Sequence, residues 1–105
     1  MQNFISKKIS LELESSVTTN AHGINRQNIT NHLIDPEEHL YLDPMDDDRT
    51  YQFWKVLEEI PGEKDGYTIF FDPESEEFGL AIYNENNQMV MLGIYGTFIE
   101  TLDSM

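Results

Sequence analysis

Histidine is the side chain of this sequence best suited to acid–base chemistry or metal binding, and it occurs three times, as His22, His32 and His39. None of the three lies in a motif that pairs a histidine with a serine nucleophile. Their spacing matches neither HxH nor HExxH, and the chain has no cysteine that could supply a thiolate ligand. We therefore expect no catalytic residue and no metal site, and the protein is not expected to be an enzyme.

Carboxylates are the other groups that could carry chemistry, and their spacing does not favour it. In "DPMDDDRTYQFW" (residues 43–54), a calcium loop that begins at Asp46 or Asp47 would have Tyr51 or Gln52 where such a loop needs glycine. Two pairs of adjacent glutamates could act as acid and base, but neighbouring residues on one element do not converge on one point. These pairs are Glu58 with Glu59 and Glu76 with Glu77. The glycines are dispersed and form no phosphate-binding loop, so no cofactor is expected.

The net charge of the chain is its most informative property. Twenty acids stand against six bases, which gives −14, a value that repels nucleic acid and anionic membranes. Residues 35–77 contain 15 of the acids and three of the bases, so this segment alone carries −12. Acidity can serve solubility alone. Its concentration in the middle of the chain instead favours a basic protein partner, with no nucleic acid and no membrane among the partners.

The whole chain, residues 1–105, is expected to form one domain, since its length suits a single core. The first eighteen residues are predicted to form a strand, because in "FISKKISLELESS" the apolar Ile9, Leu11 and Leu13 alternate with polar residues. Residues 17–36 are polar and predict a loop with one helical turn. Leu40 and Leu42 predict a short edge strand. Residues 50–60 ("TYQFWKVLEEI") have apolar residues at helical spacing and predict a helix, although a strand in a hairpin closed by "PGEKDG" is the alternative.

Three apolar runs near the C-terminus predict an antiparallel meander: "YTIFFD", "FGLAIYN" and "QMVMLGIYG", joined by short polar links. Alternation within the last two runs places bulky aliphatic residues on one face, and we expect that face to form the core. The bulky residues of this face are Phe78, Leu80 and Ile82, with Val90, Leu92 and Ile94. Thr97 and Glu100 have the spacing of a capping box that begins a short helix. The predicted class is α+β, a twisted antiparallel sheet of about four to five strands packed with one or two helices.

The run "FGLAIYNENNQMVMLGIYGTFIETLDSM" (residues 78–105), in a cysteine-free and strongly acidic domain of this length, resembles the small immunity proteins of bacterial toxin systems, particularly those of contact-dependent growth inhibition. The resemblance implies a cytoplasmic protein that binds one cognate toxin domain in the cell that makes the toxin. A basic nuclease, a ribonuclease rather than a deoxyribonuclease, is the expected target, in a 1:1 complex with a monomeric inhibitor. The N-terminal "MQNFISKKISLELES" has no apolar run of signal-peptide length, in keeping with the cytoplasm.

The expected interface consists of carboxylates that replace substrate phosphates in the toxin's cleft, with an aromatic residue as an anchor. The predicted partner-binding residues are Glu37, Glu38, Asp43, Asp46, Asp47, Asp48, Tyr51, Glu58, Glu59, Glu63, Asp65, Glu74, Glu76 and Glu77. Two alternatives remain at this point. One is a DNA-mimicking inhibitor of a restriction or CRISPR nuclease, and the other is a non-inhibitory adaptor or small-ligand module whose acidity is incidental.

Overall fold

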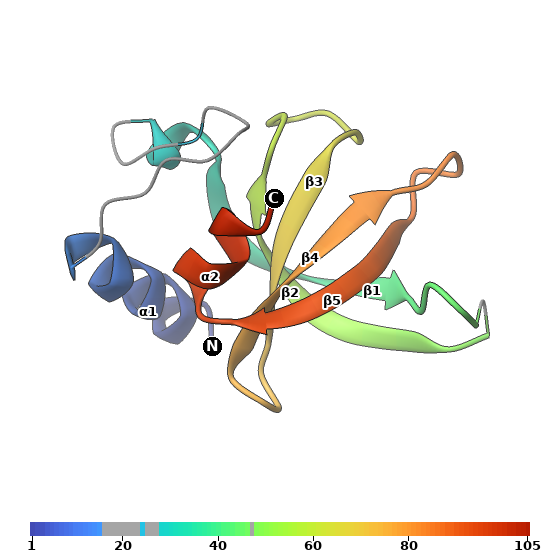
Figure 1. Cartoon of the computed structure of the whole chain (residues 1–105), viewed down its shortest axis with the longest axis horizontal. Helices are drawn as coiled ribbons and strands as arrows, with labels where there is room; N and C mark the ends of the chain where they lie inside the picture. Colours follow the sequence, from blue (N-terminus) through green and yellow to red (C-terminus); the bar gives the residue numbers. More distant parts are fainter. Residues whose placement is uncertain (16–23, 25–27, 47) are drawn as a thin grey trace.

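Five strands, each antiparallel to the next in the chain, curl into a closed barrel, and two helices lie on one side of it (Figure 1). The structure is a computed structural model that describes residues 1–15, 24, 28–46 and 48–105. The elements in order are α1 (Gln2–Ser15), the 3-10 helix η1 (Ile29–Asn31), β1 (Leu33–Leu42), β2 (Thr50–Glu58), β3 (Tyr67–Asp72), β4 (Glu77–Tyr83), β5 (Met89–Gly96) and α2 (Phe98–Asp103). The predicted α+β class and the C-terminal meander of β3, β4 and β5 are confirmed.

The barrel closes along a short seam between its first and last strands. β1 and β5 run parallel and pair only at Tyr41 with Met89 and at Leu42 with Val90. Every other pair of neighbouring strands is joined over a longer antiparallel ladder. The seam therefore brings the end of β1 beside the start of β5, next to the connection between β1 and β2.

One cluster of buried side chains fills the interior of the barrel. Each strand contributes one member, and these are Tyr41, Phe53, Phe70, Ala81 and Met89. The rings of Phe53 and Phe70 stack with their centroids 4.3 Å apart. Among the described residues neither helix contributes to this cluster, so the strands themselves must cover it. The inward face of the sheet is thus the one that bears these residues.

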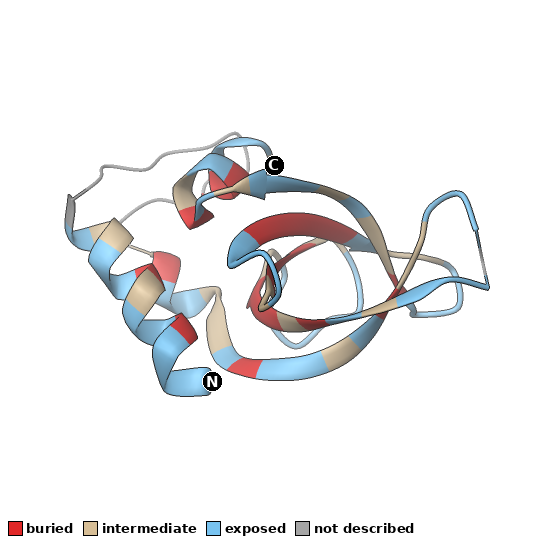
Figure 2. Ribbon diagram, turned by 90° about the horizontal axis from the view of Figure 1, so that it is seen from below, coloured by how far each residue is buried: buried red, intermediate tan, exposed pale blue. Residues whose placement is uncertain are grey.

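A second cluster lies between the outer face of the sheet and the two helices. Ile5 and Ile9 of α1 and Phe98 of α2 pack against strand residues such as Phe71 and Phe78. The Phe78 and Phe98 rings meet edge to face at 5.6 Å. Figure 2 shows the buried residues of both helices on the sides that face the strands. Burial of each such side chain stabilises the fold by about 1.5–3 kcal/mol, so this cluster attaches the helices firmly.

The strand predicted for the first eighteen residues is wrong, because Gln2–Ser15 form the helix α1, and residues 16–18 lie outside the described residues. Ile5, Ile9 and Leu13 recur every fourth residue, and this spacing puts them on one helical face toward the second cluster. Leu11 completed the alternation of apolar and polar residues that predicted a strand, and in the helix its side chain is exposed. The Glu12 carboxylate also accepts hydrogen bonds from the backbone N–H groups of Phe98 and Ile99, with N···O distances of 3.2 and 3.1 Å, and so caps the start of α2.

The helix predicted for residues 50–60 is also wrong, and the hairpin alternative is correct, since β2 occupies Thr50–Glu58. A β-bulge explains the misleading spacing. The register with β3 shifts between Lys55 and Leu57, so that the consecutive residues Val56 and Leu57 both join the helix-facing cluster. Two neighbouring apolar residues on one face are typical of a helix and are unusual in a regular strand.

β1 is longer than the sequence indicated. It begins at Leu33 and runs for ten residues, whereas a short edge strand around Leu40 and Leu42 was expected. The register with β2 is irregular between Leu33 and Glu37, and Pro36 sits in this irregular part, where a missing N–H disrupts no regular ladder. The loop predicted over residues 17–36 contains the expected helical turn, which is η1, but residues 33–36 belong to β1. Residues 17–23 and 25–27 lie outside the described residues.

The face of β4 and β5 predicted to form the core is only partly buried. Phe78 and Leu80 are buried as expected, but Ile82, Leu92 and Ile94 are exposed. The opposite face, which bears the small residues Gly79 and Ala81 of β4, points into the barrel instead. A Cβ built on Gly79 would collide with the Phe70 ring and with the Gly93 carbonyl oxygen, so only glycine fits there. The capping box is confirmed, since Thr97 N–H donates to Glu100 Oε1 and Glu100 N–H donates to Thr97 Oγ1, both at 3.1 Å.

Gly79→Ala tests this account of the narrow interior. The added methyl group must displace the Phe70 ring or the β5 backbone, and such overpacking costs about 1–3 kcal/mol. We expect a lower free energy of unfolding in urea and a lower Tm. Gly93→Ala is the matched control, because its Cβ would meet the Tyr95 ring at an ordinary 3.6 Å. Equal stability of the two variants would contradict the account.

Candidate protein-binding surface

The acidic loop is the connection between β1 and β2, residues 43–49, and its own carboxylates hold the described part of its backbone. Asp43 Oδ1 accepts the N–H of Met45 at 2.8 Å, and Asp46 Oδ1 accepts the N–H of Asp48 at 3.0 Å. Backbone hydrogen bonds join Asp43 to Arg49 and Arg49 to Asp46, at 3.0 and 3.1 Å. Asp46 and Asp48 are exposed, and Asp47 lies outside the described residues. The loop therefore presents preorganised negative charge to the solvent.

Tyr51, at the start of β2, supports this acidic loop. Its hydroxyl donates to Asp43 Oδ2 at 2.7 Å, and the Arg49 guanidinium lies 5.4 Å from the centroid of its ring. The Met45 N–H, and after it the Tyr51 hydroxyl, lower the pKa of Asp43, and the same bond to Asp43 raises the pKa of Tyr51. Tyr51 was predicted to anchor a partner. The structure gives its hydroxyl an internal role, while its ring packs beside Phe53.

The second predicted group of acids lies at the end of β2 and in the connection to β3. Glu63 and Asp65 are exposed there, but the two glutamates that precede them have internal contacts. Glu58 Oε2 lies 3.9 Å from Lys55 Nζ, and Glu59 Oε1 accepts the N–H of Tyr67 at 3.0 Å. The third group is exposed and comprises Glu74 and Glu76 in the turn between β3 and β4 and Glu77 at the start of β4.

The three acidic groups lie on different sides of the molecule. In Figure 1 the β1–β2 loop is at the right, the β2–β3 connection at the top and the β3–β4 turn at the bottom. The structure thus brings Asp43, Asp46, Asp48 and Tyr51 together, and it separates them from the other two groups. Glu37 and Glu38 are exposed on β1, in the strand that leads into the loop. One partner surface can meet the first group without meeting the second or third.

A small polar cluster inside the barrel was not foreseen from the sequence. Lys55 alternates with the buried Phe53 and is itself 8% exposed, and its Nζ donates to the Tyr83 hydroxyl at 3.3 Å. Tyr41 Oη has no hydrogen-bond partner among the described residues. The Thr68 hydroxyl, also buried, donates to Met89 Sδ at 4.0 Å. Burial, and then Tyr83, raise the pKa of Tyr41. The alternation of Phe53 with Lys55 was the signal available in the sequence.

The histidines do not gather into a site in the part of the chain that is described. His32 Nδ1 lies 3.0 Å from the carbonyl oxygen of Glu59, and burial followed by the nearby Lys55 lowers the pKa of His39. His22 lies outside the described residues. Among the residues described there is no group of three or more His, Asp or Glu side chains that could hold a metal ion.

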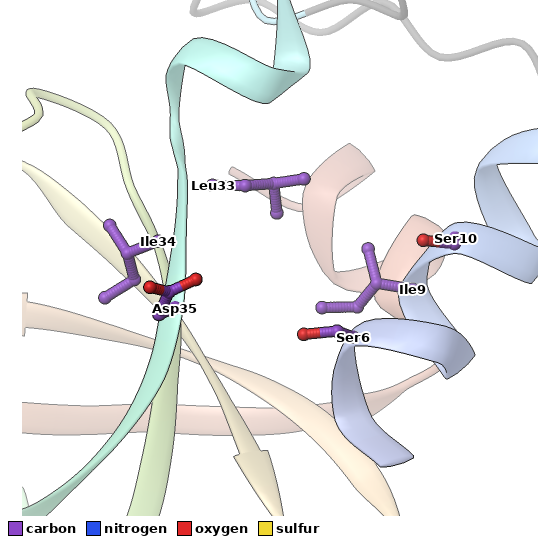
Figure 3. Close-up of a pocket in the computed structure, with 6 residues that line it drawn as sticks. All are labelled: Ser6, Ile9, Ser10, Leu33, Ile34 and Asp35. Atoms are coloured by element: carbon purple, nitrogen blue, oxygen red, sulfur yellow. The ribbon is translucent and has the colours of Figure 1, made fainter. Parts of the chain in front are cut away.

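A cavity between α1 and the start of β1 is too small to favour a ligand site. Its volume is about 200 Å³, below the roughly 300–1,000 Å³ that is usual for such sites. Figure 3 shows side chains of α1 facing those of β1 across it, with one carboxylate and two hydroxyls among them. The lining residues are Ser6, Ile9, Ser10, Leu33, Ile34 and Asp35.

Comparison with known proteins identifies no relative. No protein-family model matches the chain, and neither does any curated protein or any solved structure.

None of the described helices is long and apolar enough to cross a membrane.

Tyr51→Phe tests the internal role of the tyrosine hydroxyl. Loss of this donor should raise the pKa of Asp43 toward its ordinary value, which carboxyl-carbon NMR can follow in a pH titration. Because the folded-state pKa of Asp43 is lowered, its contacts stabilise the fold at neutral pH, and this contribution is lost as the pH falls through that pKa. Tyr83→Phe, which removes a hydroxyl away from Asp43, should leave the titration unchanged. An Asp43 pKa unaffected by Tyr51→Phe would refute the assignment.

Proposed function

We propose that this chain is an immunity-type inhibitor that binds a basic toxin domain and neutralises it. The target is a nuclease, and a ribonuclease rather than a deoxyribonuclease. The observation that carries the proposal is the preorganised acidic loop between β1 and β2, in which Asp46 and Asp48 are exposed while the backbone is held by Asx-type hydrogen bonds. The chain acts as a monomer in a 1:1 complex.

The chemistry of a nuclease cleft explains why such a loop would inhibit. The cleft must be basic to bind a polyanion, so carboxylates placed in it take the position of the phosphates and exclude the substrate. A net charge of −14 also attracts a basic partner over a long range and accelerates association. The loop loses little conformational freedom on binding because its hydrogen bonds are already formed.

The arrangement of the acids favours a protein inhibitor over a DNA mimic. A mimic of the duplex needs carboxylates spaced along one surface in the manner of phosphates. Here the acidic groups emerge on three sides of the barrel (Figure 1), and among the described residues only the β1–β2 loop combines two exposed aspartates in a single short loop.

Coexpression tests the activity itself. The reading frame beside that of this chain should encode a basic domain that arrests growth when it is expressed alone. Coexpression of the chain should restore growth, and the purified chain should form a 1:1 complex with that domain. Growth arrest that persists despite soluble coexpression would contradict the proposal, as would a neighbouring frame that encodes no toxic domain.

Neutralisation of the acidic loop tests how the toxin is bound. Asp46→Asn with Asp48→Asn keeps the side-chain oxygen that accepts the Asp48 N–H but removes two charges. The association rate at low ionic strength should fall by about three- to tenfold, and the difference should shrink as salt screens the charges. Asp35→Asn with Asp103→Asn removes the same charge from two exposed positions elsewhere and should change the rate much less. Equal effects of the two double variants would show that only the net charge matters.

A further inference from the structure

An aliphatic face on the outside of the barrel lies across the seam that joins the first and last strands. The register places Leu42 of β1 beside Val90 of β5, and Val90 opposite Ile82 of β4. Leu40 lies two residues before Leu42 on the same side of β1, and Leu92 lies two residues after Val90 at a bulge in β5. We call these five residues, drawn from three adjacent strands, the seam face.

The seam face is open to solvent in the part of the chain that is described. Leu40 is 65% exposed, Leu92 is 45% exposed and Ile82 is 37% exposed, while Leu42 and Val90 are half-buried. The helices cover the outer face of the sheet elsewhere. In Figure 1 they lie at the left, whereas the end of β1 and the start of β5 meet toward the right. Contiguous exposed aliphatic side chains on a small protein are a common mark of an interaction site.

Charge is absent from the centre of this face and present at its edge. No charged residue occurs from Gln88 to Ile99, in a chain that has 26 charged residues among 105. The acidic loop begins at Asp43, directly after Leu42, and Glu38 shares the outer side of β1 with Leu40. An apolar centre with a charged rim is the usual arrangement of a protein–protein interface.

The chemistry of the rim selects the partner. A second copy of this chain would bring one net charge of −14 against another and would set one acidic rim beside the other, which opposes association. A basic protein that presents an apolar side chain between its cationic residues fits both parts of the surface. Its cations would meet the β1–β2 loop, and its apolar residue would be desolvated on the seam face.

We propose that the seam face is the apolar centre of the interface with a basic protein, and that the acidic β1–β2 loop is the rim of the same interface. The inference rests on the proposed function only in identifying that basic protein as a toxin domain. The loop then governs how fast the complex forms, and the seam face governs how long it lasts. This division follows because long-range charge accelerates encounter, whereas desolvated apolar contacts slow dissociation.

Site-specific crosslinking in living cells locates the interface and captures the partner in one step. The photoreactive residue p-benzoylphenylalanine is placed at Leu40, at Leu92 or, as a control, at Leu11, which is exposed on α1. After illumination of the cells that make the chain, the first two positions should capture the same basic protein, and Leu11 should not. Capture of a second copy or of an acidic protein would overturn the inference, as would equal capture at Leu11 or no capture at all.

The captured basic protein then serves as the probe in binding kinetics. Leu40→Ser with Leu92→Ser should raise its dissociation rate about tenfold and leave the association rate nearly unchanged. Leu11→Ser with Ile60→Ser removes two exposed aliphatic residues elsewhere and should leave both rates unchanged. Thermal unfolding checks that each variant is folded. Unchanged dissociation from the folded seam-face variant would overturn the inference.

The two proposals fail in different ways. If the captured basic protein neither arrests growth nor is neutralised by the chain, the proposed function is wrong while the seam face remains an interface. If coexpression neutralises a toxin but the Leu40 and Leu92 variants bind it as the original chain does, the function stands and the placement of the interface is wrong.

Discussion

The interior of a five-stranded barrel is narrow, and the rings of Tyr41, Phe53 and Phe70 occupy much of it here. β4 pairs with β3 at Phe70, so it must direct small residues into the barrel at this point. Gly79 and Ala81 are these residues. Alternation along β4 then directs its large residues outward. Two of them, Phe78 and Leu80, are covered by the helices, and the third, Ile82, lies beyond the reach of the helices and joins the seam face.

The helices and the barrel depend on each other through the same outward-facing residues. Ile5 and Ile9 of α1 belong to the same buried cluster as residues of β2, β3 and β4. The Glu12 carboxylate of α1 accepts hydrogen bonds from the first N–H groups of α2. The negatively charged Glu12 carboxylate lies at the N-terminal end of α2, where the helix dipole is positive and favours an anion. Because both helices are attached to one side of the barrel, they leave the acidic loop and the seam face on the other side uncovered.

Much of the fold followed from the sequence, and the errors have definite physical causes. Residues 67–96 alternate in short apolar runs separated by turn residues, so the meander could be predicted, and Thr97 with Glu100 marked the start of α2. The N-terminal helix was mistaken for a strand because apolar residues at positions 9, 11 and 13 satisfy the period of a strand. Only positions 9 and 13, together with Ile5, fit the period of a helix, and the tertiary burial of Ile5 and Ile9 favours that period. In β2 a bulge imitated helical spacing, which local sequence cannot distinguish.

The acidic part of the candidate site could be located from the sequence because carboxylates cluster in the chain itself. Its apolar part could not, since alternation shows which residues share a face but not which face is covered. For this reason the aliphatic face of β4 and β5 was predicted to be core along its whole length, whereas it is buried at Phe78 and Leu80 and exposed at Ile82, Leu92 and Ile94. The small-residue face, in turn, fills the barrel. Only the closure of the barrel at Tyr41 and Leu42 brings Leu40 and Leu92 into one surface beside the acidic loop.

Hydrogen–deuterium exchange of the chain, free and bound to its basic partner, tests most directly that one interface combines the acidic loop with the seam face. The account predicts that backbone amides of residues 40–46 and of residues 89–93 become protected together in the complex, while those of α1 and of the β3–β4 turn exchange as they do in the free chain. Protection confined to α1 or to the β3–β4 turn, with no change in either predicted segment, would contradict it.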